Sequence, residues 1–127
     1  LLLWLGRYAD AQRDLEAAIA RQRDTRWAWY GLGWVALLSG DSRAALARCA
    51  EGIAALGGTE AAGAHGLRGE AWRRLESFTA AREALVTACR LHPRRVSAWL
   101  NLVLTLAPAG EGDDAVRTAM HVQRQFP

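Results

Sequence analysis

Aromatic residues gather at helical spacing in one stretch of the chain, residues 26–41 (RWAWYGLGWVALLSGD). Trp27, Tyr30, Trp34 and Leu37 are three or four residues apart and therefore fall on one face of a helix. Large aromatic side chains dominate the energetics of protein interfaces, so this face could bind a partner. It could also pack against neighbouring helices of the same protein. The sequence leaves both alternatives open.

Two pairs of arginines are the charged groups that could recognise a ligand. Arg73 and Arg74 could hold an acidic partner, because guanidinium groups bind carboxylates bidentately, or they could form a solvated helix end. Arg94 and Arg95 follow Pro93, and we interpret them as part of a solvated turn.

Metal and thiol chemistry find little support in the sequence. His65, His92 and His121 lack the spacing of metal ligands, so we expect no metal site. Cys49 and Cys89 lie in Ala-rich helical surroundings and form no CxxC motif. We therefore expect both cysteines to be buried free thiols.

The motifs of common enzyme classes are missing from the sequence. There is no phosphate-binding loop, no Gly-rich nucleotide turn and no nucleophile elbow. Ser42 and Ser77 precede expected helices, which is typical of N-cap residues. Asp113 and Asp114 lie at an expected helix start, where the helix dipole favours acidic residues. We expect no catalytic residues, no enzymatic activity and no cofactor.

The composition is that of a single globular all-α domain. The chain has 127 residues, 51% of them hydrophobic and 23% charged, and only three prolines. Ala and Leu abound and every basic residue other than histidine is Arg, which favours a GC-rich bacterial source. The net charge of +3 is spread over the chain, so we expect no nucleic-acid partner. No apolar run could span a bilayer and no signal peptide is evident, so we expect a cytoplasmic protein without membrane contact.

Hydrophobic periodicity predicts a short helical stub and seven helices, with no strand. The stub covers residues 1–5, and the helices cover residues 10–22, 26–38, 42–56, 61–75, 77–91, 96–107 and 113–125. Breaks are expected near Gly6, residues 22–25, Gly40, residues 57–59, Glu76, residues 92–95 and residues 108–112.

A repeat runs through these predicted helices. One set of positions recurs three times at matching offsets: first Trp29, Leu32, Gly33, Ala36, Ala45, Cys49, Gly52 and Gly57; then His65, Arg68, Gly69, Trp72, Ala81, Leu85, Ala88 and Pro93; then Trp99, Leu102, Val103, Leu106, Ala115, Ala119, Val122 and Pro127. The pattern resembles that of the tetratricopeptide (TPR) repeat family. It divides the chain into a half-repeat at 1–25 and repeats at 26–59, 62–95 and 96–127, as one TPR-like domain of a longer chain. The middle repeat is the weakest match, because His65 and Arg68 replace large apolar residues.

The resemblance implies an α-solenoid, a right-handed superhelix of stacked antiparallel helix pairs. Small residues such as Gly33 and Gly69 would let helices approach closely, and Trp29, Trp72 and Trp99 would fill the space between pairs. The first helix of each pair would line a concave groove that receives an extended or helical peptide.

The expected groove residues follow from the repeat register. They are Trp27, Tyr30, Trp34 and Leu37 in the first full repeat, Gly63, Gly66, Leu67, Glu70, Arg73 and Arg74 in the second, and Ser97, Leu100, Asn101 and Leu104 in the third. Some relatives bind terminal carboxylates of a peptide through a Lys/Asn/Lys/Arg clamp. The corresponding sites here hold Tyr30, Trp34, Leu67, Ser97 and Asn101, so that clamp is absent and we do not expect chaperone C-termini as partners.

The function that the resemblance implies is a protein-interaction module that binds a peptide or helix of a protein partner in its groove. One alternative is a regulatory or substrate-presenting domain of a larger enzyme, such as a transferase, or of a transcriptional regulator. Another is self-association through the ends of the repeat array, since residues 1–5 lack a repeat of their own and the last repeat lacks a polar capping helix.

Overall fold

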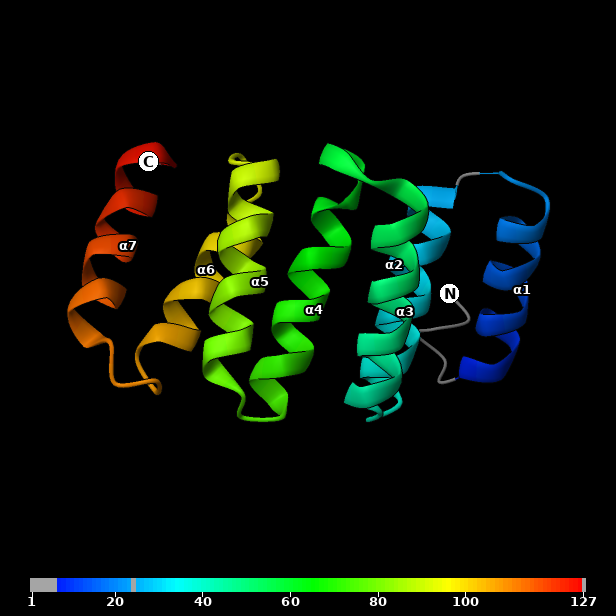
Figure 1. Ribbon diagram of the computed structural model, residues 1–127, viewed down its shortest axis with the longest axis horizontal. Helices are drawn as coiled ribbons and strands as arrows, with labels where there is room; N and C mark the ends of the chain where they lie inside the picture. The colour runs from blue at the N-terminus through cyan, green and yellow to red at the C-terminus, as the bar shows by residue number, and fades with distance from the viewer. Residues whose placement is uncertain (1–6, 24, 127) are drawn as a thin grey trace.

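The computed structural model describes residues 7–23 and 25–126. Within these ranges the chain forms seven α-helices and one 3₁₀ turn, and no strand (Figure 1). The elements are α1 (Tyr8–Ala20), α2 (Thr25–Leu38), α3 (Ser42–Leu56), η1 (Gly58–Ala61), α4 (Ala62–Arg74), α5 (Phe78–Leu91), α6 (Val96–Leu106) and α7 (Gly112–Gln125). The seven predicted helices are confirmed. The predicted stub at residues 1–5, the break at Gly6, and Asp24 within the predicted break at residues 22–25 lie outside the described residues.

Four of the helix ends share one backbone turn. The residues Gln22, Gly40, Glu76 and Gly110 each have a positive φ, between 54° and 85°. The amide that follows each of them donates back to a carbonyl five residues earlier, as Asp41 N does to Ala36 O at 2.9 Å. This geometry closes a helix by satisfying its last carbonyls, and it explains why the chain turns at the predicted breaks.

The helix starts differ in detail from the expectation. Asp41 caps α3, since its carboxylate accepts a hydrogen bond from Ala44 N at 2.9 Å, and Ser42 is the first residue of that helix. Ser77 lies at the N-cap position of α5, but its hydroxyl makes no capping hydrogen bond. The predicted break after α3 is present, with the additional turn η1 after two positive-φ glycines, Gly57 and Gly58.

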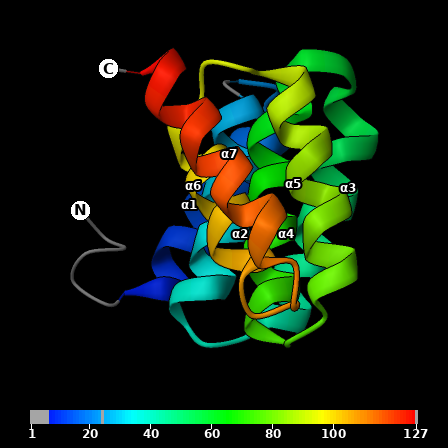
Figure 2. The same cartoon turned by 90° about the vertical axis from the view of Figure 1, so that its left-hand side faces the viewer.

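The helices stack in an open row. Each α-helix contacts the next along the chain, and α4 also contacts α2 and α6. Helices α1 and α7 lie at opposite ends of the long axis (Figure 1), so the row does not close into a bundle. Figure 2, which views the row from one end, places α3 and α5 to one side of α2 and α6. This arrangement is a helical solenoid, in which α2, α4 and α6 form one layer.

Close helix approach depends on glycine at two positions. A Cβ atom on Gly69 of α4 would lie 2.4 Å from Leu85 Cγ of α5, and one on Gly33 of α2 would lie 2.9 Å from Leu67 Cδ1 of α4. Both glycines are buried, so these positions have no room for a side chain. The predicted role of small residues at Gly33 and Gly69 is confirmed.

The core consists of two clusters of buried side chains. One joins α2, α3 and α4 and includes Leu37, Cys49 and Leu67; the other joins α5, α6 and α7 and includes Leu85 and Leu102. The predicted burial of the two cysteines, Cys49 and Cys89, as free thiols is confirmed, and burial raises the pKa of each thiol to about 12.

Trp99 packs against the second cluster and is half-buried. Its indole Nε1 donates a hydrogen bond to Pro93 O at 2.8 Å. The ring therefore ties the start of α6 to the turn that follows α5. None of the described helices is long and apolar enough to cross a membrane.

Candidate functional site

A cavity of about 340 Å³ lies over the layer formed by α2, α4 and α6. Nine of its eleven lining residues belong to the groove set expected from the repeat register: Tyr30, Trp34, Gly63, Gly66, Leu67, Glu70, Arg73, Ser97 and Asn101. Residues from three helices, separated by up to 71 positions in the sequence, thus surround one hollow. The cavity is large enough for one or two side chains of a ligand.

The hollow exists because the middle helix carries glycine where the first helix carries aromatic residues. In the repeat register, Gly63 and Gly66 of α4 correspond to Trp27 and Tyr30 of α2. A Cβ atom on Gly66 would meet no heavy atom within 4 Å, so open space lies above this residue. The glycines of the middle helix thus leave a depression in the helix layer.

Tyr30 and Trp34 of α2 form one wall of the cavity, and Trp27 continues their row outside its lining. The rings of Trp27 and Tyr30 are 6.2 Å apart at an interplanar angle of 88°, and those of Tyr30 and Trp34 are 6.3 Å apart at 75°. These edge-to-face contacts hold the three rings in a fixed row. Trp27 is 58% exposed, whereas Tyr30 and Trp34 are half-buried against the α2–α3–α4 core cluster. Tyr30 and Trp34 thus pack within the protein and also face the cavity.

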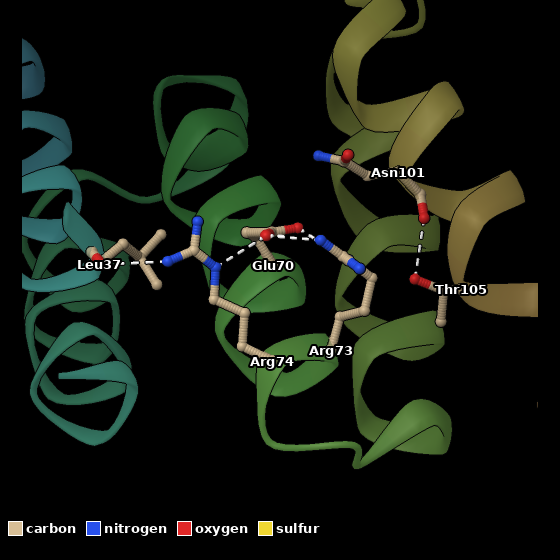
Figure 3. Close-up of polar contacts among 6 residues, drawn as sticks. All are labelled: Leu37, Glu70, Arg73, Arg74, Asn101 and Thr105. Atoms are coloured by element: carbon tan, nitrogen blue, oxygen red, sulfur yellow. Dashed lines mark hydrogen bonds and ion pairs between the residues drawn. The ribbon is translucent and has the colours of Figure 1, made fainter. Parts of the chain in front are cut away.

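A three-residue ion network occupies α4 beside the hollow (Figure 3). Arg73 Nε donates to Glu70 Oε1 at 2.9 Å and Arg73 Nη2 donates to Oε2 at 2.8 Å. Arg74 Nε donates to the same Oε2 at 2.9 Å, and its Nη1 donates to Leu37 O at 3.0 Å. The spacing of these residues, i, i+3 and i+4, places all three on one helix face.

Hydrogen bonds from the two arginines control the ionisation of Glu70. Burial raises the pKa of the Glu70 carboxyl, but the hydrogen bonds and charges of Arg73 and Arg74 more than offset this and leave the pKa below its ordinary value of 4.5. Glu70 in turn raises the pKa of Arg73. The sequence left two alternatives for Arg73 and Arg74, an acidic partner or a solvated helix end. In the structure both guanidinium groups bind Glu70 and Arg74 also binds a backbone carbonyl, so an acidic partner would have to compete with Glu70 for them.

Several expected groove residues offer little or no surface at the cavity. Leu37 is 1% exposed and belongs to the α2–α3–α4 core, so it has no surface to offer to a partner. Leu67 lines the cavity but is only 4% exposed. Leu100 and Leu104 are 48% and 55% exposed on α6, but they do not line the cavity.

Sequence reasoning missed Arg95, the residue that precedes α6. We interpreted it as part of a solvated turn, but it is half-buried and lines the cavity. Its guanidinium carbon lies 5.4 Å from the centre of the Tyr30 ring, within the range of a cation–π contact. The one available signal was its position directly before the first helix of a repeat. Ala98, also in the cavity lining, is a buried residue of α6 that sequence reasoning did not assign to the groove.

Clusters suited to metal binding are not found in the part of the chain that the structure describes. No group of three or more His, Cys, Asp and Glu side chains comes together there. The chemistry of the cavity is therefore that of an aromatic wall, an open floor over glycine and guanidinium groups at the edge.

Comparison with known protein families supports the repeat pattern found in the sequence. The sequence profile of the tetratricopeptide repeat family matches residues 1–58 and 67–120, which together are most of the chain. The chain belongs to the tetratricopeptide repeat family. No curated protein matches it. Repeats of this family are generally protein-interaction modules and typically serve as a non-catalytic scaffold.

Proposed function

We propose that this chain is a protein-interaction module that binds a peptide or helix of a partner over the cavity between α2, α4 and α6. The observation that supports this most strongly is the shared cavity itself. Nine residues expected from the repeat register line it, from three different helices. An interaction module needs a surface that is concave, partly apolar and formed before the ligand arrives, and this one meets all three requirements.

The aromatic wall supplies most of the binding energy in this proposal. Tyr30 and Trp34 are held by edge-to-face packing and by the core cluster beneath them. A ligand side chain that enters the hollow over Gly66 meets rings that lose little conformational entropy on binding. Asn101 of α6 lines the same hollow and can donate to or accept from a peptide backbone.

Selection from a phage-displayed library of random dodecapeptides provides a ligand with which to test this proposal. The dissociation constant of a selected, synthesised peptide is then measured for the wild-type chain and for Trp34→Ala. Removal of a central aromatic residue costs about 2 kcal/mol or more, so we expect the affinity to fall about 30-fold.

Met120→Ala is the matched control, since Met120 is an exposed apolar residue of α7 outside the cavity lining. It should leave the affinity unchanged. The proposal is wrong if no selected peptide depends on Trp34. It is also wrong if Trp34→Ala unfolds the chain as readily as Trp99→Ala, because the aromatic face would then be core alone.

A further inference from the structure

A second, smaller cavity of about 200 Å³ adjoins the first. The two share Tyr30, Gly63 and Arg95 as lining residues, so they form one continuous depression. The smaller cavity extends it toward Arg26 and Trp27 in the first turns of α2 and toward Glu60 in η1. Gly63 keeps the junction open, since a Cβ atom there would lie 2.8 Å from Tyr30 Cδ1 and 3.0 Å from Arg95 Nη1.

Two guanidinium groups are positioned over aromatic rings at this cavity. The guanidinium carbon of Arg26 lies 5.4 Å from the centre of the Trp27 ring, and that of Arg95 lies 5.4 Å from the centre of the Tyr30 ring. A guanidinium held over a ring can still direct its N–H groups outward to a carboxylate. The rings thus restrict two long side chains before a ligand arrives, which lowers the entropic cost of binding.

These two arginines differ from the pair on α4. Arg73 and Arg74 both bind Glu70, whereas within residues 7–23 and 25–126 no carboxylate forms an ion pair with Arg26 or Arg95. Among the residues that the structure describes, Glu60 is the one acidic residue that lines the smaller cavity, and it is exposed. The described residues at this end of the depression thus present two arginines and one glutamate to a ligand, an excess of positive charge.

We infer that the peptide bound in this depression carries an aspartate or glutamate whose carboxylate binds between Arg26 and Arg95, beside an apolar residue that fills the hollow over Gly66. This inference rests on the proposed function and specifies the chemistry of the partner. The site differs from the Lys/Asn/Lys/Arg clamp, because Arg95 precedes α6 and Arg26 lies in the first turn of α2, outside the positions that correspond to that clamp.

Four dissociation constants test the inference, those of two peptides for the wild-type chain and for Arg95→Gln. The probes are an acidic dodecapeptide from the selection above and the same peptide with its Asp or Glu changed to Asn or Gln. We expect the amide form to bind the wild-type chain about tenfold more weakly, because a charge-assisted, bidentate contact is lost. We expect Arg95→Gln to weaken binding of the acidic peptide by about the same factor and to bind both peptides alike.

Arg94→Gln is the matched control, because it removes the same charge from the adjacent, exposed residue. It should change the affinity by less than about twofold. Arg95 makes no side-chain capping hydrogen bond to α6, so Arg95→Gln should keep the helical circular dichroism of the wild type.

The outcomes distinguish a failure of this inference from a failure of the proposed function. If the selected peptides lack acidic residues, or if Arg95→Gln and Arg94→Gln behave alike, the carboxylate site is wrong. Trp34→Ala would still weaken binding about 30-fold in that case, and the proposed function would stand. If no peptide depends on Trp34, both are wrong.

Discussion

Gly66 offers a substitution that should stabilise the fold and weaken peptide binding together. This residue lies inside α4, where glycine costs about 1 kcal/mol relative to alanine because the unfolded chain gains conformational freedom. A Cβ atom at Gly66 would meet nothing within 4 Å. Gly66→Leu should therefore raise the free energy of unfolding by about 0.5–1 kcal/mol, since leucine is a good helix former and its Cβ atom enters open space.

The same leucine would occupy the hollow between Tyr30, Trp34 and Asn101. We expect it to weaken peptide binding tenfold or more, because it fills the space that the apolar residue of the peptide must enter. Urea unfolding followed by circular dichroism measures the first effect, and fluorescence anisotropy with a labelled, selected peptide measures the second.

Two matched variants separate the contributions. Gly66→Ala should give a similar gain in stability with most of the affinity retained, since it adds a single methyl group. Gly69→Leu should lower stability by about 1–3 kcal/mol, because Leu85 Cγ lies 2.4 Å from the position of the new Cβ atom. The reasoning is refuted if Gly66→Leu binds peptide as the wild type does, or if it destabilises the chain as much as Gly69→Leu.

Three further predictions concern the scaffold. Trp99→Ala should lower the free energy of unfolding by about 3 kcal/mol in urea melts, since the ring packs on the α5–α6–α7 core and binds Pro93 O. Glu70→Gln should cost about 1–2 kcal/mol at neutral pH. The folded pKa of Glu70 lies below its ordinary value of 4.5, so the stability that its carboxylate provides is present above pH 4.5. That stability is lost as the pH falls through the lowered pKa. Melts at decreasing pH should therefore show the stabilities of the wild type and Glu70→Gln converging. Glu76→Gly should stabilise by up to about 1 kcal/mol in the same melts, because Glu76 has a φ of 60° at a turn where Gly40 and Gly110 hold the equivalent positions.

Sequence periodicity and end signals predicted the helices well, although α4 lacks the clear apolar stripe of α1, α5 and α7. The helix predicted at residues 42–56 matches α3 at both ends, and the starts of the others differ by at most two residues. The turn η1 was missed, because a 3₁₀ turn after two positive-φ glycines has no periodicity of its own. The repeat register then placed Tyr30, Trp34 and Asn101 at one surface, since equivalent positions of stacked repeats face the same way.

The polar part of the site was harder to predict. The i, i+3 and i+4 spacing of Glu70, Arg73 and Arg74 was sufficient to indicate an ion network within one helix. This network pairs both guanidinium groups with Glu70. The contact between Arg95 and Tyr30 joins residues 65 positions apart, and its geometry depends on how the turn before α6 packs beside α2. No local pattern carries that information.

Mapping of backbone amide chemical shifts during titration with the selected peptide tests most directly whether the layer of α2, α4 and α6 is the binding surface. We predict that the largest shifts occur at Tyr30, Trp34, Gly66 and Asn101, with smaller shifts at Arg95, and that α3 and α5 remain unperturbed. Largest shifts on α3 and α5, or on the exposed residues Val116 and Met120 of α7, would contradict the account.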